Sequence, residues 1–234
     1  MARRLIQPFG RSLLSLRFTQ NFLIPQQQPN VPLQTRNYIS EMRKLAFEGN
    51  ILRLLRNEIQ YELDRSPPLQ QPVPKFNSFV VDERPGEQWI RLNRKFGENE
   101  EIKVEVTMFD GSAPVQKTGS IDAGEDVKLH ITFIVDIFKE DRSDALEFVC
   151  SAWSDSIEIQ RVFMRGCGQM VDQPYTGPGF KELDDQLQDS LYHFLEARGI
   201  NDDLAVFLHE YMRNKDKTEF IRWMGTVKSF IERK

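Results

Sequence analysis

The chain has 234 residues, of which 40% are hydrophobic, and its 31 basic and 35 acidic side chains give a formal net charge of −4. This length accommodates one ordinary domain with a packed core, with or without a small second one. No stretch approaches the roughly 18 consecutive apolar residues of a transmembrane helix, and the acidic balance disfavours direct binding to the phosphates of DNA.

The first 38 residues form a basic segment that contains no acidic residue. Leucines and Phe18 lie between its five arginines, a composition that can form the basic amphipathic helix of a mitochondrial or chloroplast presequence. The RNYIS stretch, Arg36 to Ser40, is similar to a matrix-protease site with arginine two residues before the cut. We therefore expect a mitochondrial transit peptide over residues 1–38, cleavage after Tyr38 and a functional domain over 39–234. A disordered basic tail is the alternative interpretation.

Removal of the five arginines would leave 26 basic against 35 acidic residues, a net charge of about −9. Such a surface attracts basic proteins, basic peptides or cations, because its summed field steers opposite charges. Acidity alone is weak evidence for binding, since many proteins are acidic simply to stay in solution. The two cysteines, Cys150 and Cys167, are too few for a disulfide framework and lack metal-ligand spacing, so both are expected to be free thiols.

A helix is predicted over Ser40 to Asp64, followed by the helix-breaking stretch Ser66 to Pro74. Its apolar residues recur at helical spacing: Met42, Leu45, Leu52, Leu55, Ile59 and Leu63. We expect this helix to pack against the C-terminal helix and to hold an oligomer together, with Leu55 and Ile59 at the contact.

The middle of the chain predicts an antiparallel sheet. Residues Glu101 to Met108 and Val127 to Phe138 alternate apolar and polar side chains with period two. Four further strand-like stretches are FNSFVVDE, WIRLNRKF, ALEFVCSAW and SIEIQRVFM. Short polar links without intervening helices indicate a meander with one covered face and one wet face.

Helices are predicted to cover this sheet. Residues Phe180 to Glu196 place an apolar arc on one side and an acidic face of Glu182, Asp185, Asp189 and Glu196 on the other. Asn201 is expected to cap a middle helix, and Asp216 to Glu219 resembles a capping box that starts a last helix. The apolar stripe of that last helix comprises Phe220, Trp223, Met224, Val227, Phe230 and Ile231.

No catalytic, cofactor-binding or metal-binding residue is expected. The pair His209 and Glu210 looks like half of a zinc-protease helix, but the position of the second histidine is Arg213. We expect the pair to lie on a solvated helix face, and His193 likewise on the surface. The GCGQMV stretch lacks the third glycine of a dinucleotide fingerprint, and the chain contains neither a nucleophile elbow nor a P-loop.

The pattern resembles the mitochondrial glycoprotein family, which comprises acidic proteins of the mitochondrial matrix. The resemblance covers about residues 40–234. Its most specific parts are the YTGP turn at Tyr175 to Pro178, the LEARGI helix end at Leu195 to Ile200 and the terminal EFIRWMGTVKSFI. It implies an α+β fold with a seven-stranded antiparallel sheet, one N-terminal and two C-terminal helices, and a doughnut-shaped homotrimer. The link Asp110 to Asp126 has few acidic residues, whereas the animal relative in this family carries a long acidic loop there. The resemblance therefore does not imply, for this chain, any partner that depends on that loop.

The resemblance also implies a non-enzymatic adaptor or chaperone-like binder that supports mitochondrial translation and oxidative phosphorylation. The expected partners are basic mitochondrial proteins, including components of the ribosome or of respiratory-complex assembly. The acidic face is the candidate binding surface, although an ordinary solvated helix face explains it about equally well. Candidate oligomer contacts are Leu55, Ile59, Trp223 and Phe230. The competing classes are a structural subunit of a larger complex, which predicts an exposed apolar patch, and an enzyme, which predicts a polar pocket.

Overall fold

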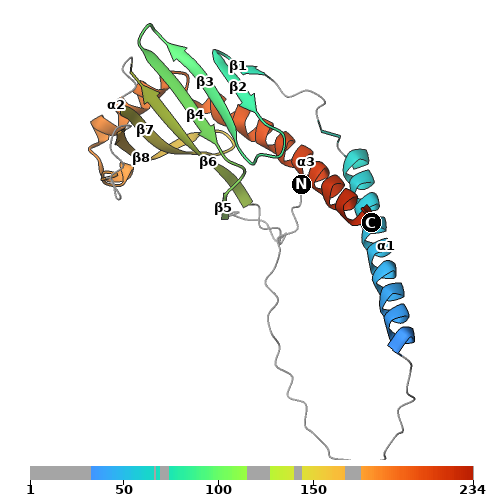
Figure 1. Ribbon diagram of the computed structural model, residues 1–234. Helices are drawn as coiled ribbons and strands as arrows, with labels where there is room; N and C mark the ends of the chain where they lie inside the picture. The colour runs from blue at the N-terminus through green and yellow to red at the C-terminus, as the bar shows by residue number, and fades with distance from the viewer. Residues whose placement is uncertain are drawn as a thin grey trace, which may run out of the picture. The chain divides into compact units, whose positions relative to one another are not determined.

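The computed structural model describes residues 33–65, 67–68, 74–114, 127–139, 144–166 and 175–233 (Figure 1). Most of the predicted transit peptide, most of the stretch Ser66 to Pro74, Cys167 and residues 115–126 lie outside the described residues. The chain divides into two units, Met1–Ala46 and Phe47–Lys234. The described part of the first unit is the N-terminal portion of helix α1, Leu33–Arg65, in which residues 37–46 are exposed. This helix begins earlier than predicted, so it runs through the predicted cleavage position between Tyr38 and Ile39.

The second unit is built on an antiparallel sheet in the order β1-β2-β3-β4-β6-β7-β8, with β5 also paired to β6. The strands are β1 Lys75–Phe76, β2 Phe79–Glu83, β3 Ile90–Phe96, β4 Glu100–Val106, β5 Gly111–Pro114, β6 Val127–Phe138, β7 Asp144–Ala152 and β8 Ile157–Gly166. The predicted α+β meander is confirmed, and β6 has the predicted bounds. Strand β5 was not predicted, because it is short and lies in the turn-rich link that follows Asp110.

Alternation along the strands builds the core. In β4 the side chains of Ile102, Val104 and Val106 are fully buried, as the period-two pattern predicts. Val104 lies between Leu92 of β3 and Val135 of β6 in the strand register, which makes the inner face continuous across the sheet. Each such side chain contributes about 1.5–3 kcal/mol by leaving water.

Helices cover the inner face. They are the short 3-10 helix η1, Phe180–Glu182, helix α2, Asp185–Glu196, and helix α3, Asp202–Glu232. Leu195 of α2 and Leu204, Leu208 and Met212 of α3 complete the core. Figure 1 shows α3 crossing behind the sheet and continuing beyond it.

The LEARGI sequence forms the corner between α2 and α3. Arg198 donates two hydrogen bonds to the carboxylate of Glu100 and stacks on the ring of Phe194, with its guanidinium carbon 3.5 Å from the ring centre. Gly199 adopts a φ of +80°, a left-handed conformation that strongly favours glycine. A β-carbon there would also lie 2.6 Å from Nη1 of Arg94. The corner therefore needs glycine for both its backbone and its space.

Two predicted helix boundaries are wrong. The segment Phe180 to Glu196 is not one helix, because Leu183 is extended and Asp184 caps α2 by accepting a hydrogen bond from the backbone N–H of Gln186. The predicted break at Asp216 is absent, and α3 is continuous over 31 residues. Lys215 and Glu219 form an i,i+4 ion pair across the predicted boundary, and such a pair supports a continuous helix.

The prediction for His209 is also wrong, whereas Glu210 is exposed as expected. His209 is 5% exposed, and its Nε2 lies 2.9 Å from the backbone oxygen of Ala152 at the end of β7. Burial lowers the pKa of His209, an effect that this hydrogen bond opposes. The histidine is therefore a core residue that satisfies the carbonyl at a strand end.

Candidate functional site: surfaces of the helices

The four residues of the predicted acidic face are exposed, but only three of them lie on the same helix. Asp185, Asp189 and Glu196 of α2 are exposed and fall within about 40° of one another on a helical projection. Glu182 is also exposed, but it belongs to η1 and is separated from α2 by the extended Leu183. The four carboxylates therefore form a surface cluster over η1 and α2 and not a stripe along a single helix.

Some acidic residues in this region have structural roles. Asp184 and Asp185 lie at the N-terminus of α2, and Asp202 and Asp203 in the first turn of α3, where negative charge complements the helix dipole. Asp202 also accepts a hydrogen bond from the backbone N–H of Ile157. Capping chemistry could have identified Asp184, which the sequence reasoning overlooked. Helix termini thus explain part of the acidity, while Asp189 and Glu196 lie beyond the first turn.

A second surface lies where α1 runs beside the C-terminal half of α3. Arg56 of α1 bonds to Glu232 of α3 at 2.8 Å, and Glu62 pairs with Lys217 at 4.0 Å. Leu55 and Ile59 are half-buried on the face of α1 that carries Glu62. These contacts join two segments, 47–65 of α1 and 216–232 of α3, which we call the helical arm.

The helical arm exposes large apolar side chains. Trp223 is 57% exposed and Phe230 is 75% exposed, and Trp223 stacks on Phe220. On α1 the exposed apolar residues include Phe47, Ile51, Leu54 and Tyr61. A shallow hollow of about 320 Å³ is lined by Glu48, Ile51, Phe230, Ile231 and Arg233. An apolar surface of this kind is characteristic of a protein contact.

The face of the sheet opposite the helices carries a buried ionic cluster. Asp136 of β6 and Glu147 of β7 are partners in the strand register, and Arg165 of β8 bonds to them at 2.6 and 2.7 Å respectively. Burial, together with the neighbouring carboxylate of Asp136, raises the pKa of Glu147 despite the opposing effect of Arg165. Because Asp136 and Glu147 are 2% and 8% exposed, this cluster ties three strands together and is not a docking surface.

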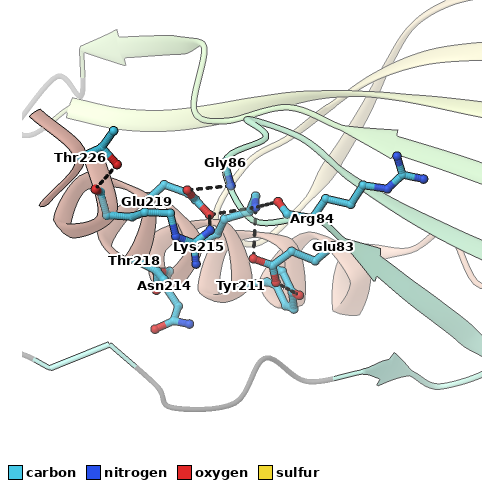
Figure 2. A network of polar contacts seen from close by, with 10 residues as sticks. Glu83, Arg84, Gly86, Tyr211, Asn214, Lys215, Thr218, Glu219 and Thr226 are labelled. Atoms are coloured by element: carbon cyan, nitrogen blue, oxygen red, sulfur yellow. Dashed lines mark hydrogen bonds and ion pairs between the residues drawn. The ribbon is translucent and has the colours of Figure 1, made fainter. Parts of the chain in front are cut away.

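A third polar cluster joins the β2–β3 turn to the middle of α3 (Figure 2). Lys215 has a fully buried side chain, and its Nζ lies 3.1 Å from Glu83 Oε1 and donates to the backbone oxygen of Arg84. Tyr211 donates its hydroxyl hydrogen to Glu83, and Glu219 accepts from the backbone N–H of Gly86. Burial and the bond to Glu83 raise the pKa of Tyr211. The sequence could not have revealed this cluster, because Glu83 and Lys215 are 132 residues apart.

Three further properties of the described residues concern metal ions, membranes and thiol chemistry. Within them, no group of three or more histidine, cysteine, aspartate or glutamate side chains is placed to hold a metal ion. No helix among them is both long and apolar enough to cross a membrane. Burial raises the pKa of the Cys150 thiol, which makes it a poor nucleophile.

The chain is thus a helix-covered antiparallel sheet whose helices expose a cluster of carboxylates and several large apolar side chains. The family model for the mitochondrial glycoprotein family, MAM33, matches residues 55–231. The chain belongs to this family. An uncharacterized mitochondrial protein of Arabidopsis thaliana is 30% identical over 201 residues, which cover 84% of this chain and 80% of that protein. The mitochondrial acidic protein mam33 of Schizosaccharomyces pombe is 24% identical over 212 residues, 79% of this chain and 78% of its own length.

Solved structures show the same fold. The p22 protein of Trypanosoma brucei superposes with a TM-score of 0.64 at 22% identity, covering 80% of this chain and 100% of that one. A Leishmania major protein of unknown function, described as a sequence homologue of human p32, gives 0.61 at 20% identity, covering 79% and 99%. Family membership supports a mitochondrial acidic protein with a non-enzymatic binding role.

Proposed function

We propose that the protein acts in the mitochondrial matrix as a multivalent adaptor or chaperone-like binder of basic proteins. Its partners would include components of the ribosome or of respiratory-complex assembly, and through them it would support mitochondrial translation and oxidative phosphorylation. The observation that carries this proposal is the cluster of exposed carboxylates over η1 and α2, on a member of an acidic mitochondrial family.

The physical basis is electrostatic attraction combined with multivalency. Exposed carboxylates raise the local concentration of basic partners, and salt screens them beyond a Debye length of roughly 8–10 Å. In a homotrimer the same cluster would occur three times, so that weak contacts reinforce one another. Binding should therefore be strong at low salt and weaken steeply towards physiological ionic strength.

The homotrimer is part of the proposal and is supported by the exposed apolar residues of the helical arm. Substituting Trp223 and Phe230 by Asp should convert trimer to monomer, because both side chains are exposed in one protomer and the change leaves its core intact. Leu187→Asp is the matched control, since Leu187 is 47% exposed on α2, outside the helical arm. Light scattering measures the outcome. A monomeric wild-type protein at micromolar concentration would instead favour a structural subunit whose apolar surface contacts a different protein.

The binding role is tested by removing the acidic cluster. Glu182 and Glu196 become Gln, Asp185 and Asp189 become Asn, and capture of matrix proteins and of a lysine-rich peptide is measured from low to physiological salt. The matched control removes four exposed carboxylates elsewhere and outside the helical arm: Glu41, Glu98, Asp144 and Glu210. Both variants lose the same charge. The proposal requires that the first variant lose far more binding than the second while its oligomeric mass stays unchanged. Equal losses would show that only net charge matters, and unchanged binding would show that the cluster is ordinary solvated surface.

A further inference from the structure

Lys215 is unusual because the side chain of this lysine has no exposed surface. Its ammonium group lies 3.1 Å from Glu83 Oε1, 3.2 Å from the backbone oxygen of Arg84 and 3.7 Å from Glu219 Oε1. Three donors on the ammonium group thus face three acceptors from the end of β2, the following turn and α3 (Figure 2). Burial of this charge is sustained only by such complete pairing.

The two carboxylates are themselves held in place. Glu83 accepts from the Tyr211 hydroxyl, and Glu219 accepts from the backbone N–H of Gly86 at 3.0 Å and from Arg222 at 3.0 Å. Residues 83–86 are therefore tied to α3 over more than two helical turns. We call the set Glu83, Arg84, Gly86, Tyr211, Lys215 and Glu219 the Lys215 clasp.

The clasp lies at the point where α3 leaves the sheet. Before it, α3 packs on the core through Leu204, Leu208 and Met212. Among the described residues of α3 that follow the clasp, Met224 is the buried one, and the ion pair of Lys217 with Glu62 joins α3 to α1. Within the described part of the chain, the bond from Gly86 to Glu219 is the most C-terminal hydrogen bond between α3 and the sheet or its turns.

We propose that the Lys215 clasp sets the direction in which residues 216–232 leave the sheet, and that it thereby determines assembly without being part of the contact between copies. This rests on the homotrimer proposed above. From Lys215 to Glu232 the helix extends about 26 Å, at 1.5 Å per residue. A tilt of about 10° at the clasp would move its end by roughly 4–5 Å over that length. Closely packed surfaces do not tolerate displacements of this size.

The ionic chemistry of the clasp suits this role. Replacing a buried ion pair by uncharged groups of similar volume is often neutral for stability, whereas hydrogen-bonded charges fix one geometry. A clasp that determines direction should therefore affect assembly more than folding. This separation distinguishes the proposal from a merely stabilising role.

The experiment replaces the central pair with uncharged groups of similar shape, Glu83→Gln and Lys215→Met, so that Tyr211 still finds an acceptor. Expected results are an unfolding midpoint close to that of the wild type and an at least about tenfold higher concentration for half-dissociation of the oligomer. Glu158→Gln with Lys181→Met is the matched control, because it removes a glutamate–lysine ion pair outside the clasp, in which Lys181 is exposed and Glu158 is half-buried, and it should change neither quantity. Glu219→Ala leaves the Glu83–Lys215 pair in place and removes the bonds of Glu219 to Gly86 and Arg222 and its ion pair with Lys215. It should shift dissociation in the same direction by less, and it remains available if the double variant fails to fold.

A direct readout of direction separates failure of the clasp from failure of the homotrimer. Spin labels at Lys95→Cys on β3 and Ser229→Cys on α3, in a Cys167→Ser background and diluted with unlabelled protein, report the distance between sheet and α3 by pulsed electron resonance. The clasp variants should broaden this distance distribution, and the control should not. An unchanged width together with unchanged dissociation would overturn the proposal. If the wild type proves monomeric, the proposed homotrimer and the assembly role both fail, and an unchanged width would then overturn the orientation role as well.

Discussion

Substitution of Gly199 by Ala tests whether the LEARGI corner depends on glycine for two separate reasons. The first is backbone strain, because a φ of +80° costs an alanine about 1–2 kcal/mol. The second is space, because the new β-carbon would lie 2.6 Å from Nη1 of Arg94 and 3.3 Å from Cε2 of Phe79. Arg94 donates to the backbone oxygen of Arg198, so its displacement also weakens a partly buried, charged hydrogen bond worth about 1–2 kcal/mol.

These terms predict a loss of about 2–4 kcal/mol in the free energy of unfolding for Gly199→Ala, from strain plus displacement of Arg94. The matched control is Gly97→Ala in the β3–β4 turn. Gly97 also has a positive φ, +62°, but a β-carbon there meets nothing within 4 Å. The control should lose only the strain, about 1–2 kcal/mol. Denaturant unfolding at one fixed protein concentration measures both. Equal losses in the two variants would refute the steric part of this reasoning, and a loss below about 0.5 kcal/mol for Gly199→Ala would refute all of it.

Two further outcomes concern pH and processing. Because the pKa of His209 is lowered in the fold, the unfolded chain takes up the proton first as pH falls below about 6.5. The free energy of unfolding should therefore decrease between pH 6.5 and 5.5, by at most about 1.4 kcal/mol per pH unit. In His209→Gln this decrease should be smaller in thermal melts across that range, and an unchanged profile would exclude the histidine as its source. Protein isolated from mitochondria should begin at or just after Ile39, and N-terminal sequencing that returned Met1 would rule out a cleaved presequence.

Sequence periodicity predicted those parts of the fold in which one element determines its own pattern. The bounds of β6 followed from strict alternation between Val127 and Phe138, and the core face of α3 followed from Leu204, Leu208 and Tyr211. Helix ends were harder, because both Asp184 and Asp216 are plausible caps and only the former is used. The choice depends on tertiary contacts, since Lys215 finds Glu83 on a distant turn and the helix continues through Asp216.

In the candidate site, too, some features follow from the pattern of one element and others depend on contacts between elements. Exposure of Asp185, Asp189 and Glu196 could be predicted from the helical period, whereas the separation of Glu182 depends on the local cap at Asp184. The burial of His209 could not be predicted, because it depends on where α3 passes the carbonyl of Ala152. The apolar stripe that includes Trp223 and Phe230 was visible in the sequence, but in one protomer these two side chains stay exposed while Met224 of the same stripe is buried. The contact that would cover Trp223 and Phe230 is the one between copies in the proposed homotrimer.

The pairing of β5 with β6 makes one position suitable for protein engineering. Pro114 and Val127 are direct partners in the strand register, so the chain leaves and re-enters the sheet at the same point. By loop-closure entropy, lengthening a connection whose two ends are fixed side by side costs only about 0.6 kcal/mol for each doubling of its length. An affinity tag, a fluorescent protein or a charged peptide could therefore be inserted between these residues without altering the strand register, which would provide a graft point separate from both termini and from the helices.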